Sequence, residues 1–226
     1  MPTVVTRLAL GSGAFGVNAY LLETGSGFVL VDTGMRSQRA SLERRLSDAG
    51  CTRGALKLMF ITHGDFDHIG NAAHLQREFD APIAMHRNDA DMAANGDMFA
   101  GRQSPGWFAR RILPLLVRLP ETHRFEPGVL LDEGFDLAGY GLPDSQVLLV
   151  PGHSSGSVAL LLEDGSLFCG DVLENRSEPK LGSIMDDVPA AQRSVERLQT
   201  LSVATVYPGH GAPFPMADLV QSTDSR

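Results

Sequence analysis

Cysteine is almost absent from this chain, which has only Cys51 and Cys169 among 226 residues. Two cysteines are too few for the disulfide framework of a small secreted protein, so the sequence excludes that class. Cys169 lies two residues before Asp171, which makes metal ligation by its thiol conceivable. The expected role of Cys169 is nevertheless that of a small buried apolar side chain.

Basic residues are also few, with 19 Lys and Arg against 27 Asp and Glu and a formal net charge of −8. Nucleic acids and anionic membranes select basic surfaces, so neither is an expected partner, and a small-molecule substrate is expected instead. No apolar run approaches membrane-spanning length, and Met1–Val5 lacks the basic and apolar segments of a signal peptide. We therefore expect a cytoplasmic protein.

The chain contains two halves with the same order of elements, and its length and apolar fraction of 43% fit a single domain over residues 1–226. Each half begins with strand-like runs and continues with a helix and a further strand. Asp164-Gly165 indicates a tight hairpin in the second half. The expected strands are Thr3–Leu10, Val17–Glu23, Phe28–Asp32, Lys57–Thr62, Pro82–Met85, Gln146–Val150, Val158–Glu163, Leu167–Cys169 and Val203–Tyr207.

Two helices are indicated by N-cap residues followed by apolar side chains at helical spacing. Ser37 is the expected N-cap of a helix that ends before Gly50, and Asp187 is the expected N-cap of a later one. Their apolar faces are formed by Leu42, Leu46 and Ala49 and by Ala191, Val195 and Leu198. The two halves predict an α/β fold in which two mixed β-sheets pack face to face with helices outside, a four-layer αβ/βα sandwich.

Candidate metal ligands crowd the segment that follows the strand at Lys57–Thr62. The segment contains His63, Asp65, Asp67 and His68 within six residues. Imidazole nitrogens and carboxylate oxygens suit borderline divalent cations such as zinc, and a loop at the end of a strand can direct several of them at one volume. This segment therefore predicts a metal-binding loop.

Three further candidate ligands, His153, Asp171 and His210, stand far downstream, each at a turn. Together with the loop they make seven ligands, which is enough for two metal ions. The alternative is a polar surface loop plus three unrelated turn residues, but it requires several independent coincidences. We predict a dinuclear metal site.

These residues resemble the signature of the metallo-β-lactamase superfamily, which is His-x-His-x-Asp-His after a strand followed by a separate His, Asp and His. The segments Asn18–Leu22, Val31–Gly34 and Tyr207–Gly211 are also similar to that family. The resemblance implies the same four-layer sandwich and two divalent metal ions, with zinc expected first and manganese or iron as alternatives. It also implies a set of ligands: His63, Asp65 and His153 for one metal, Asp67, His68 and His210 for the other, and Asp171 as the bridge.

Asp65 departs from the family pattern, which has histidine at that position. Three carboxylates around two dications make the site less positive, so bound water keeps a higher pKa and preference shifts toward manganese or iron relative to zinc. Alternatively, the aspartate side chain is too short to reach, which would leave the first site weak or empty.

Two other motifs point to different classes of enzyme, but the element that follows each is wrong. Gly11–Gly16, with Asp32 downstream, matches a dinucleotide-binding pattern, yet Val17–Glu23 is too short for the required helix. Gly152–Gly156 matches the nucleophile elbow of a serine hydrolase, with Ser154 as the nucleophile and Asp171 and His210 in triad order. A strand rather than a helix is expected after it.

Several polar residues have a functional and an ordinary interpretation. Asp32 either accepts a hydrogen bond from a ligand histidine or is a plain turn residue. Asn175 either faces the substrate or satisfies backbone groups in its loop. His74, His86 and His123 are expected to be ordinary surface or core histidines.

The segment at about residues 97–126 has no counterpart in the first half and is predicted to be an amphipathic helical insertion. It contains Trp107 and several other apolar residues among arginines. It can cover the site, form an apolar wall of the substrate pocket, or pack against a second copy of the chain in a homodimer. Simple core packing is the alternative.

The resemblance implies hydrolysis. Two cations roughly 3.5–4 Å apart hold a bridging hydroxide as nucleophile and polarise a carbonyl oxygen. Asp67 is the candidate catalytic residue, because a carboxylate beside the nucleophile can orient it or accept its proton. Small esters, lactones or thioesters are the expected substrates. The alternatives are phosphodiester or organophosphate hydrolysis, di-iron redox chemistry, and a non-catalytic metal-binding protein.

Overall fold

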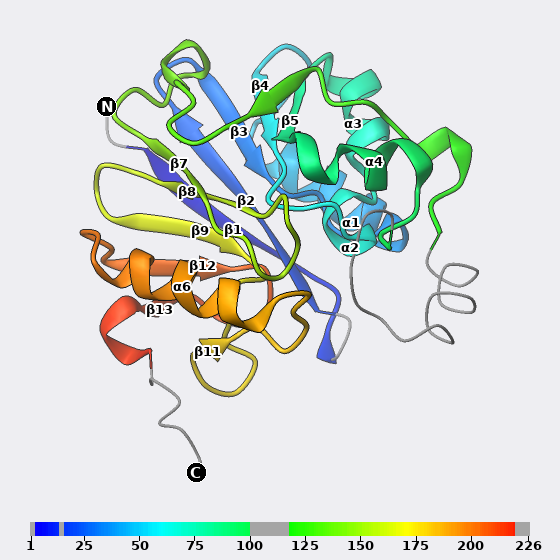
Figure 1. Ribbon diagram of the computed structural model, residues 1–226. Coiled ribbons are helices and arrows are strands. Elements are labelled where there is room, and N and C mark those ends of the chain that lie inside the picture. The colour runs from blue at the N-terminus through cyan, green and yellow to red at the C-terminus, as the bar shows by residue number, and fades with distance from the viewer. Residues whose placement is uncertain (1–2, 14–15, 100–117, 220–226) are drawn as a thin grey trace.

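The computed structural model describes residues 3–13, 16–99 and 118–219 (Figure 1). Its longer strands are β1 (Val4–Leu10), β2 (Val17–Thr24), β3 (Gly27–Val31), β4 (Leu56–Phe60), β5 (Ile83–His86), β7 (Gln146–Leu149), β8 (Val158–Leu161), β9 (Ser166–Gly170) and β12 (Thr205–Pro208). The shorter ones are β6 (Val129–Leu131), β10 (Leu173–Glu174), β11 (Lys180–Leu181) and β13 (Phe214–Pro215). The helices are α1 (Arg39–Asp48), α2 (Phe66–Ile69), α3 (Ala72–Phe79), α4 (Arg87–Asn95) and α6 (Val188–Gln199).

All of these strands except β10 and β11, which pair with each other, form two mixed sheets, as predicted. The first has the order β1-β2-β3-β4-β5-β6, with antiparallel pairs from β1 to β3 and parallel pairs from β3 to β6. The second has the order β13-β12-β9-β8-β7, in which β12 runs parallel to β9 and the other pairs are antiparallel.

Three apolar layers separate four layers of secondary structure. One layer joins the first sheet to the helices outside it, a second lies between the two sheets, and a third joins the second sheet to α6. Figure 1 shows α1 to α4 gathered on one side of the molecule and α6 lying across the second sheet. This arrangement confirms the predicted four-layer sandwich and follows from strands that are apolar on both faces.

Aromatic rings fill the layer between the two sheets. Phe168 is completely buried and stacks on Tyr207 with ring centroids 4.8 Å apart. Tyr20 meets both rings edge-on, at 5.3 Å from Phe168 and 5.4 Å from Tyr207. Because β2 contributes Tyr20 while β9 and β12 contribute the other two, these contacts tie the halves of the chain together.

The predicted strands are observed with ends shifted by one or two residues, whereas β6, β10, β11 and β13 were not predicted. Asp187 caps α6 as expected, since its Oδ1 accepts a hydrogen bond from Ala190 N at 2.9 Å. The prediction of Ser37 as an N-cap is wrong. Ser37 lies inside a 3-10 helix, Arg36–Gln38, that precedes α1, and Gln38 Oε1 accepts from Met35 N.

Residues 100–117 of the predicted helical insertion lie outside the described residues. In the described part of that segment, Glu121–His123 forms a 3-10 helix. Among the helices of residues 3–13, 16–99 and 118–219, none combines the length and apolar character needed to cross a lipid bilayer.

Candidate metal centre

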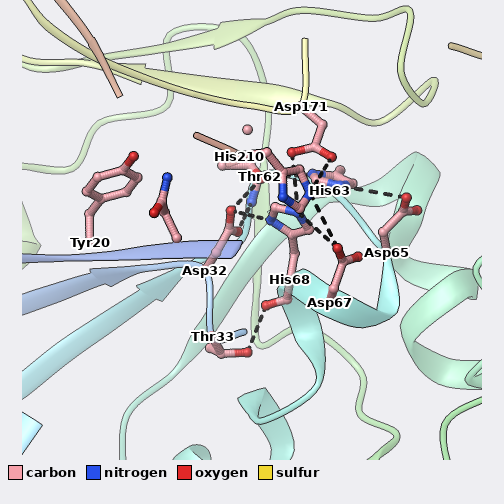
Figure 2. A network of polar contacts seen from close by, with 12 residues as sticks. Tyr20, Asp32, Thr33, Thr62, His63, Asp65, Asp67, His68, Asp171 and His210 are labelled. Carbon is pink, nitrogen blue, oxygen red and sulfur yellow. Dashed lines mark hydrogen bonds and ion pairs between the residues drawn. The ribbon is translucent and has the colours of Figure 1, made fainter. Parts of the chain in front are cut away.

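The predicted metal-binding loop turns from β4 into the short helix α2 (Figure 2). His63 lies between these elements, and Asp65 is the N-cap residue of α2 with an extended backbone (φ −73°, ψ 144°). Asp67 and His68 lie within α2, where His68 N donates to Asp65 O at 2.9 Å. Because the chain changes from strand to helix here, all four side chains can point toward the same volume. Residues on one face of a single strand could not do so.

The downstream candidates follow strands of the second sheet. His153 comes after β7, Asp171 directly after β9, and His210 shortly after β12. Because β9 and β12 run parallel, their carboxyl ends meet, and Gly209 N donates to Gly170 O at 2.8 Å there. The inter-sheet packing brings this edge to the end of β4.

The first cluster consists of His63, Asp65 and His153, whose ligand atoms all lie within 4.8 Å of one another. Asp65 Oδ2 is 3.1 Å from His153 Nε2 and 3.9 Å from His63 Nε2. All three residues are buried. The shorter aspartate therefore reaches the histidines that the resemblance assigned to the same metal.

The second cluster consists of Asp67, His68 and His210, again within 4.8 Å of one another. Asp67 Oδ2 is 3.4 Å from His210 Nε2 and 4.0 Å from His68 Nε2. Asp171 lies alongside, with Oδ1 at 3.3 Å from His68 Nε2 and Oδ2 at 3.2 Å from His210 Nε2. Asp171 also groups with His63 and His68, so its carboxylate lies between the clusters.

The chemistry of these side chains fits divalent cations. Four imidazoles and three carboxylates converge, a mixture that suits zinc, manganese or iron. Within the described residues, the buried atoms His68 Nε2 and Asp171 Oδ1 make no hydrogen bond, although they lie only 3.3 Å apart. Since buried polar atoms rarely lack a hydrogen bond, this pair fits a cation held between them.

Each of the four imidazoles is oriented by a contact at its outer nitrogen. The Nδ1 atoms of His68, His210 and His153 lie 2.8, 2.7 and 2.8 Å from Asp32 Oδ2, Gly16 O and Ile184 O, respectively. These oxygens accept a hydrogen bond from Nδ1–H, so the proton stays on Nδ1 and Nε2 faces the clusters with a free lone pair.

The fourth imidazole, His63, is oriented through a hydroxyl group. Its Nδ1 lies 2.9 Å from Thr62 Oγ1, and that hydroxyl donates to Asp32 Oδ2 at 2.8 Å. The hydroxyl oxygen is therefore able to accept from His63 Nδ1, which again leaves Nε2 facing inward.

Asp32 has the supporting role that was one of its two interpretations. Its carboxylate is buried and accepts from His68 Nδ1 and from both the amide and the hydroxyl of Thr62 (Figure 2). The backbone of Asp32 has φ +57°, a conformation that few residues other than glycine adopt, and aspartate is among the more tolerant.

The side chains compensate one another's charge. Burial disfavours the charged imidazole of His210, but Asp171 and Asp67 outweigh burial and raise the pKa of His210 to about 9. The same balance applies to His68: burial lowers its pKa, but Asp171 raises that pKa well above the usual value. Burial alone would raise the carboxyl pKa values, yet His68 and His210 lower the pKa of Asp67 and lower that of Asp171 well below its usual range.

The segment carrying His210 is held by the N-terminal strands. Tyr20 Oη and Asn18 Nδ2 donate to Pro208 O at 2.6 and 2.9 Å. Asn18 Nδ2 and Arg7 Nη2 donate to Gly211 O, each at 2.8 Å. The Asn18–Leu22 strand noted in the sequence thus positions the last candidate ligand.

Gly209 permits the close approach of this segment to the centre. A Cβ atom there would lie 2.2 Å from Asp171 Oδ1 and 2.6 Å from His68 Cε1. Any side chain at this position would displace one of the two.

Neither alternative motif has the structure that its chemistry requires. β2, not a helix, follows the glycines at 11–16, and β8 follows the segment at 152–156. Ser154 is completely buried, and its Oγ donates to Asp89 Oδ2 at 2.7 Å. A serine in that setting is a structural hydrogen-bond donor rather than an exposed nucleophile.

The remaining polar candidates have ordinary roles. Asn175 Nδ2 donates to Ala212 O at 3.0 Å, so this side chain satisfies its own loop. His86 caps α4, and His74 and His123 contact Glu43 and Arg39. Cys169 is buried, which raises the pKa of its thiol to about 12.

Asp89 was missed by the sequence analysis. It is completely buried in the first turn of α4 and contacts the loops on both sides of the first cluster. Its partners are backbone amides and a serine hydroxyl 25 to 67 residues away, a pattern with no recognisable signal in the sequence.

Comparison with known proteins gives one consistent result. A family model described as "Metallo-beta-lactamase superfamily" matches residues 12–210. The probable metallo-hydrolase YqgX of Bacillus subtilis is 28% identical over 222 residues, covering 95% of this chain and 92% of that protein. A solved structure, TTHA1623 in a di-iron-bound form, has a TM-score of 0.70 and 29% identity, covering 92% of this chain and 94% of that one.

A relative with a named activity is more distant. The atrochrysone carboxyl ACP thioesterase of Aspergillus fumigatus is 23% identical over 216 residues, covering 93% of this chain. The chain spans only 56% of that relative's length.

Proposed function

The chain belongs to the metallo-beta-lactamase superfamily, and from that premise we propose that it is a hydrolase with two divalent metal ions that acts on a small ester, lactone or thioester. The observation that supports this proposal is the convergence of seven side chains from four separate segments into two adjoining ligand clusters.

Each residue of the centre has a distinct task in this proposal. His63, Asp65 and His153 hold the first metal, Asp67, His68 and His210 hold the second, and Asp171 bridges them. When bound, the two cations supply Lewis acidity and lower the pKa of water to near neutrality. Asp32 and the acceptors at the other Nδ1 atoms fix the imidazoles in the tautomer that presents Nε2.

Asp67 is the proposed catalytic residue. Its carboxylate is less buried than that of Asp171, with side-chain exposures of 20% and 15%. The pKa of Asp67 is lowered by the neighbouring imidazoles, so its carboxylate is ionised at neutral pH and can only accept protons. It therefore orients the attacking water through a hydrogen bond or accepts its proton.

A cavity lined in part by Gly211, the neighbour of His210 in the chain, supports a small substrate. Its volume is about 300 Å³, and its lining includes Gly16, Asn18 and Gly211 together with the cations Arg7 and Arg176. The named activity of the Aspergillus fumigatus relative supports a thioester among the candidate bonds.

The test is metal analysis followed by a substrate screen. We expect two equivalents of zinc, manganese or iron per chain in unsupplemented protein, with turnover of at least one lactone, ester or thioester and loss of that turnover after chelation. Turnover of phosphodiesters alone, iron with consumption of oxygen, or two metals with no turnover would each replace the proposal with a different function. Full activity after exhaustive treatment with EDTA would overturn it.

A further inference from the structure

Asp89 joins the two loops that carry the first ligand cluster. Its Oδ2 accepts from Gly64 N at 2.9 Å and from Ser154 Oγ at 2.7 Å, and its Oδ1 accepts from Gly156 N at 3.0 Å. Gly64 lies between His63 and Asp65 in the chain, and Ser154 follows His153. One buried carboxylate thus bonds to the immediate neighbours of all three ligands.

Both loops lie against α4 with no room for a side chain at Gly64 or at Gly156. A Cβ atom at Gly64 would lie 2.8 Å from Met92 Cβ, and one at Gly156 would lie 2.4 Å from Asp89 Oδ1. Since glycine occupies both positions, the backbone amides reach the carboxylate directly. The contact is a close-packed junction, and its spacing is fixed by the Asp89 side chain.

The second ligand cluster has supports of its own. His68 and His210 are oriented through Asp32 and Gly16, and the segment of His210 is held by Asn18 and Tyr20. A defect at Asp89 should therefore act more strongly on the first cluster than on the second.

We infer that Asp89 is a positioning residue that sets the spacing of the first metal site, an inference that rests on the proposed assignment of His63, Asp65 and His153 as metal ligands. Asp65 has a short side chain, and its Oδ2 lies 3.1 Å from His153 Nε2 in an arrangement in which both loops are bonded to Asp89 of α4. A small separation of the loops takes Asp65 out of reach of a shared cation.

The substitution Asp89→Asn removes part of the hydrogen bonding of this side chain without changing its size. The carboxylate accepts three hydrogen bonds through two oxygens, whereas an amide has one acceptor oxygen and an NH₂ group. In either orientation, the NH₂ group of Asp89→Asn faces an N–H donor of one loop. The side chain keeps its size, but one of the two loops loses its partner.

Site-resolved metal titration is the test. Zinc and manganese are titrated into stripped protein against a competing chelator, with His153→Ala and His210→Ala marking the loss of the first and second site. We expect Asp89→Asn to weaken the first site by about 10- to 100-fold, a range typical for residues that orient metal ligands, and to leave the second within about twofold. Asp164→Asn is the control, because Asp164 Oδ1 also accepts a backbone N–H but lies in the β8–β9 hairpin.

Equal weakening of both sites, or an unchanged first site, would overturn the inference. If Asp89→Asn does not fold, Ser154→Ala provides the measurement, because it removes one of the three donors; it should weaken the first site by a few fold, and an unchanged first site there would also overturn the inference. The readout is binding rather than turnover. Wild-type protein that binds two cations but hydrolyses nothing would therefore refute the proposed function and leave the role of Asp89 standing.

Discussion

Metal binding to this protein should be strongly dependent on pH, because a cation must displace protons from the second ligand cluster. With the pKa of His210 at about 9, its imidazole in stripped protein is almost entirely protonated at pH 7. Only about 1% of molecules then offer a neutral Nε2, so the apparent affinity of the second site at pH 7 should be on the order of 100-fold below its value above pH 9. That factor corresponds to about 3 kcal/mol, and His68, whose pKa is also raised, makes the dependence steeper.

The assay is chelator competition from pH 6.5 to 9, combined with calorimetry in two buffers of different ionisation enthalpy to count released protons. We expect affinity to rise at least tenfold per pH unit between pH 7 and 9 and at least one proton to be released at pH 7. His74→Gln is the control, because His74 pairs with Glu43 in another part of the molecule and should not contribute. An affinity for the second site that does not change with pH would refute the reasoning.

The same protonation affects the stability of stripped protein. The pKa of His210 is about 9 in the folded protein and near 6.5 in the unfolded chain, so protonation of His210 stabilises the folded state. This contribution is fully present below pH 6.5 and is lost as pH rises through about 9. The free energy of unfolding without metal should therefore fall across that interval, in the opposite direction to metal affinity.

Three further substitutions test other parts of the structure. Asp65→His should shift metal preference from manganese toward zinc and move the acidic limb of the pH–rate profile to lower pH, because it removes a negative charge; an identical metal content and profile would contradict the charge argument. Tyr20→Phe should lower the free energy of unfolding by about 1 kcal/mol in urea titrations, since Pro208 O keeps its bond from Asn18; a loss above about 3 kcal/mol would mean that the hydroxyl has a larger role. Phe168→Ala should cost about 3–5 kcal/mol by thermal unfolding, whereas a cost below about 1 kcal/mol would show that the layer between the sheets repacks.

Much of the fold could be predicted from the sequence because the main strands carry their own signal. β2, β8 and β9 are apolar and buried on both faces, and their turns contain glycine, as at Gly165 with φ +84°. By contrast, β6, β10, β11 and β13 have two or three residues and exist only through their neighbours. Ser37 failed as an N-cap because it lies inside the 3-10 helix Arg36–Gln38, where the side chain of Gln38 rather than that of Ser37 accepts the hydrogen bond from Met35 N.

The candidate ligands could be predicted from the sequence, but the residues that hold them in place could not. His63, Asp65 and the other candidate ligands could be named because their chemistry is unusual and each follows a strand. The residues that hold them could not, because Asp89 works through the backbone amides of distant loops and Tyr20 through a carbonyl 188 residues away. A residue whose main-chain amide or carbonyl makes a hydrogen bond can be of almost any type, so its identity in the sequence does not reveal the contact.

The hydrogen bonds from β2 to the segment that carries His210 have a consequence for the order in which the centre forms during synthesis. The ribosome makes β2 before the carbonyls that the strand binds, which follow some 190 residues later. A nascent polypeptide therefore displays the His63–His68 motif long before the second cluster is complete. Under the proposed ligand assignment, the second metal site forms only after the segment of His210 has been made, and a chain terminated ahead of Pro208 should not retain a second cation.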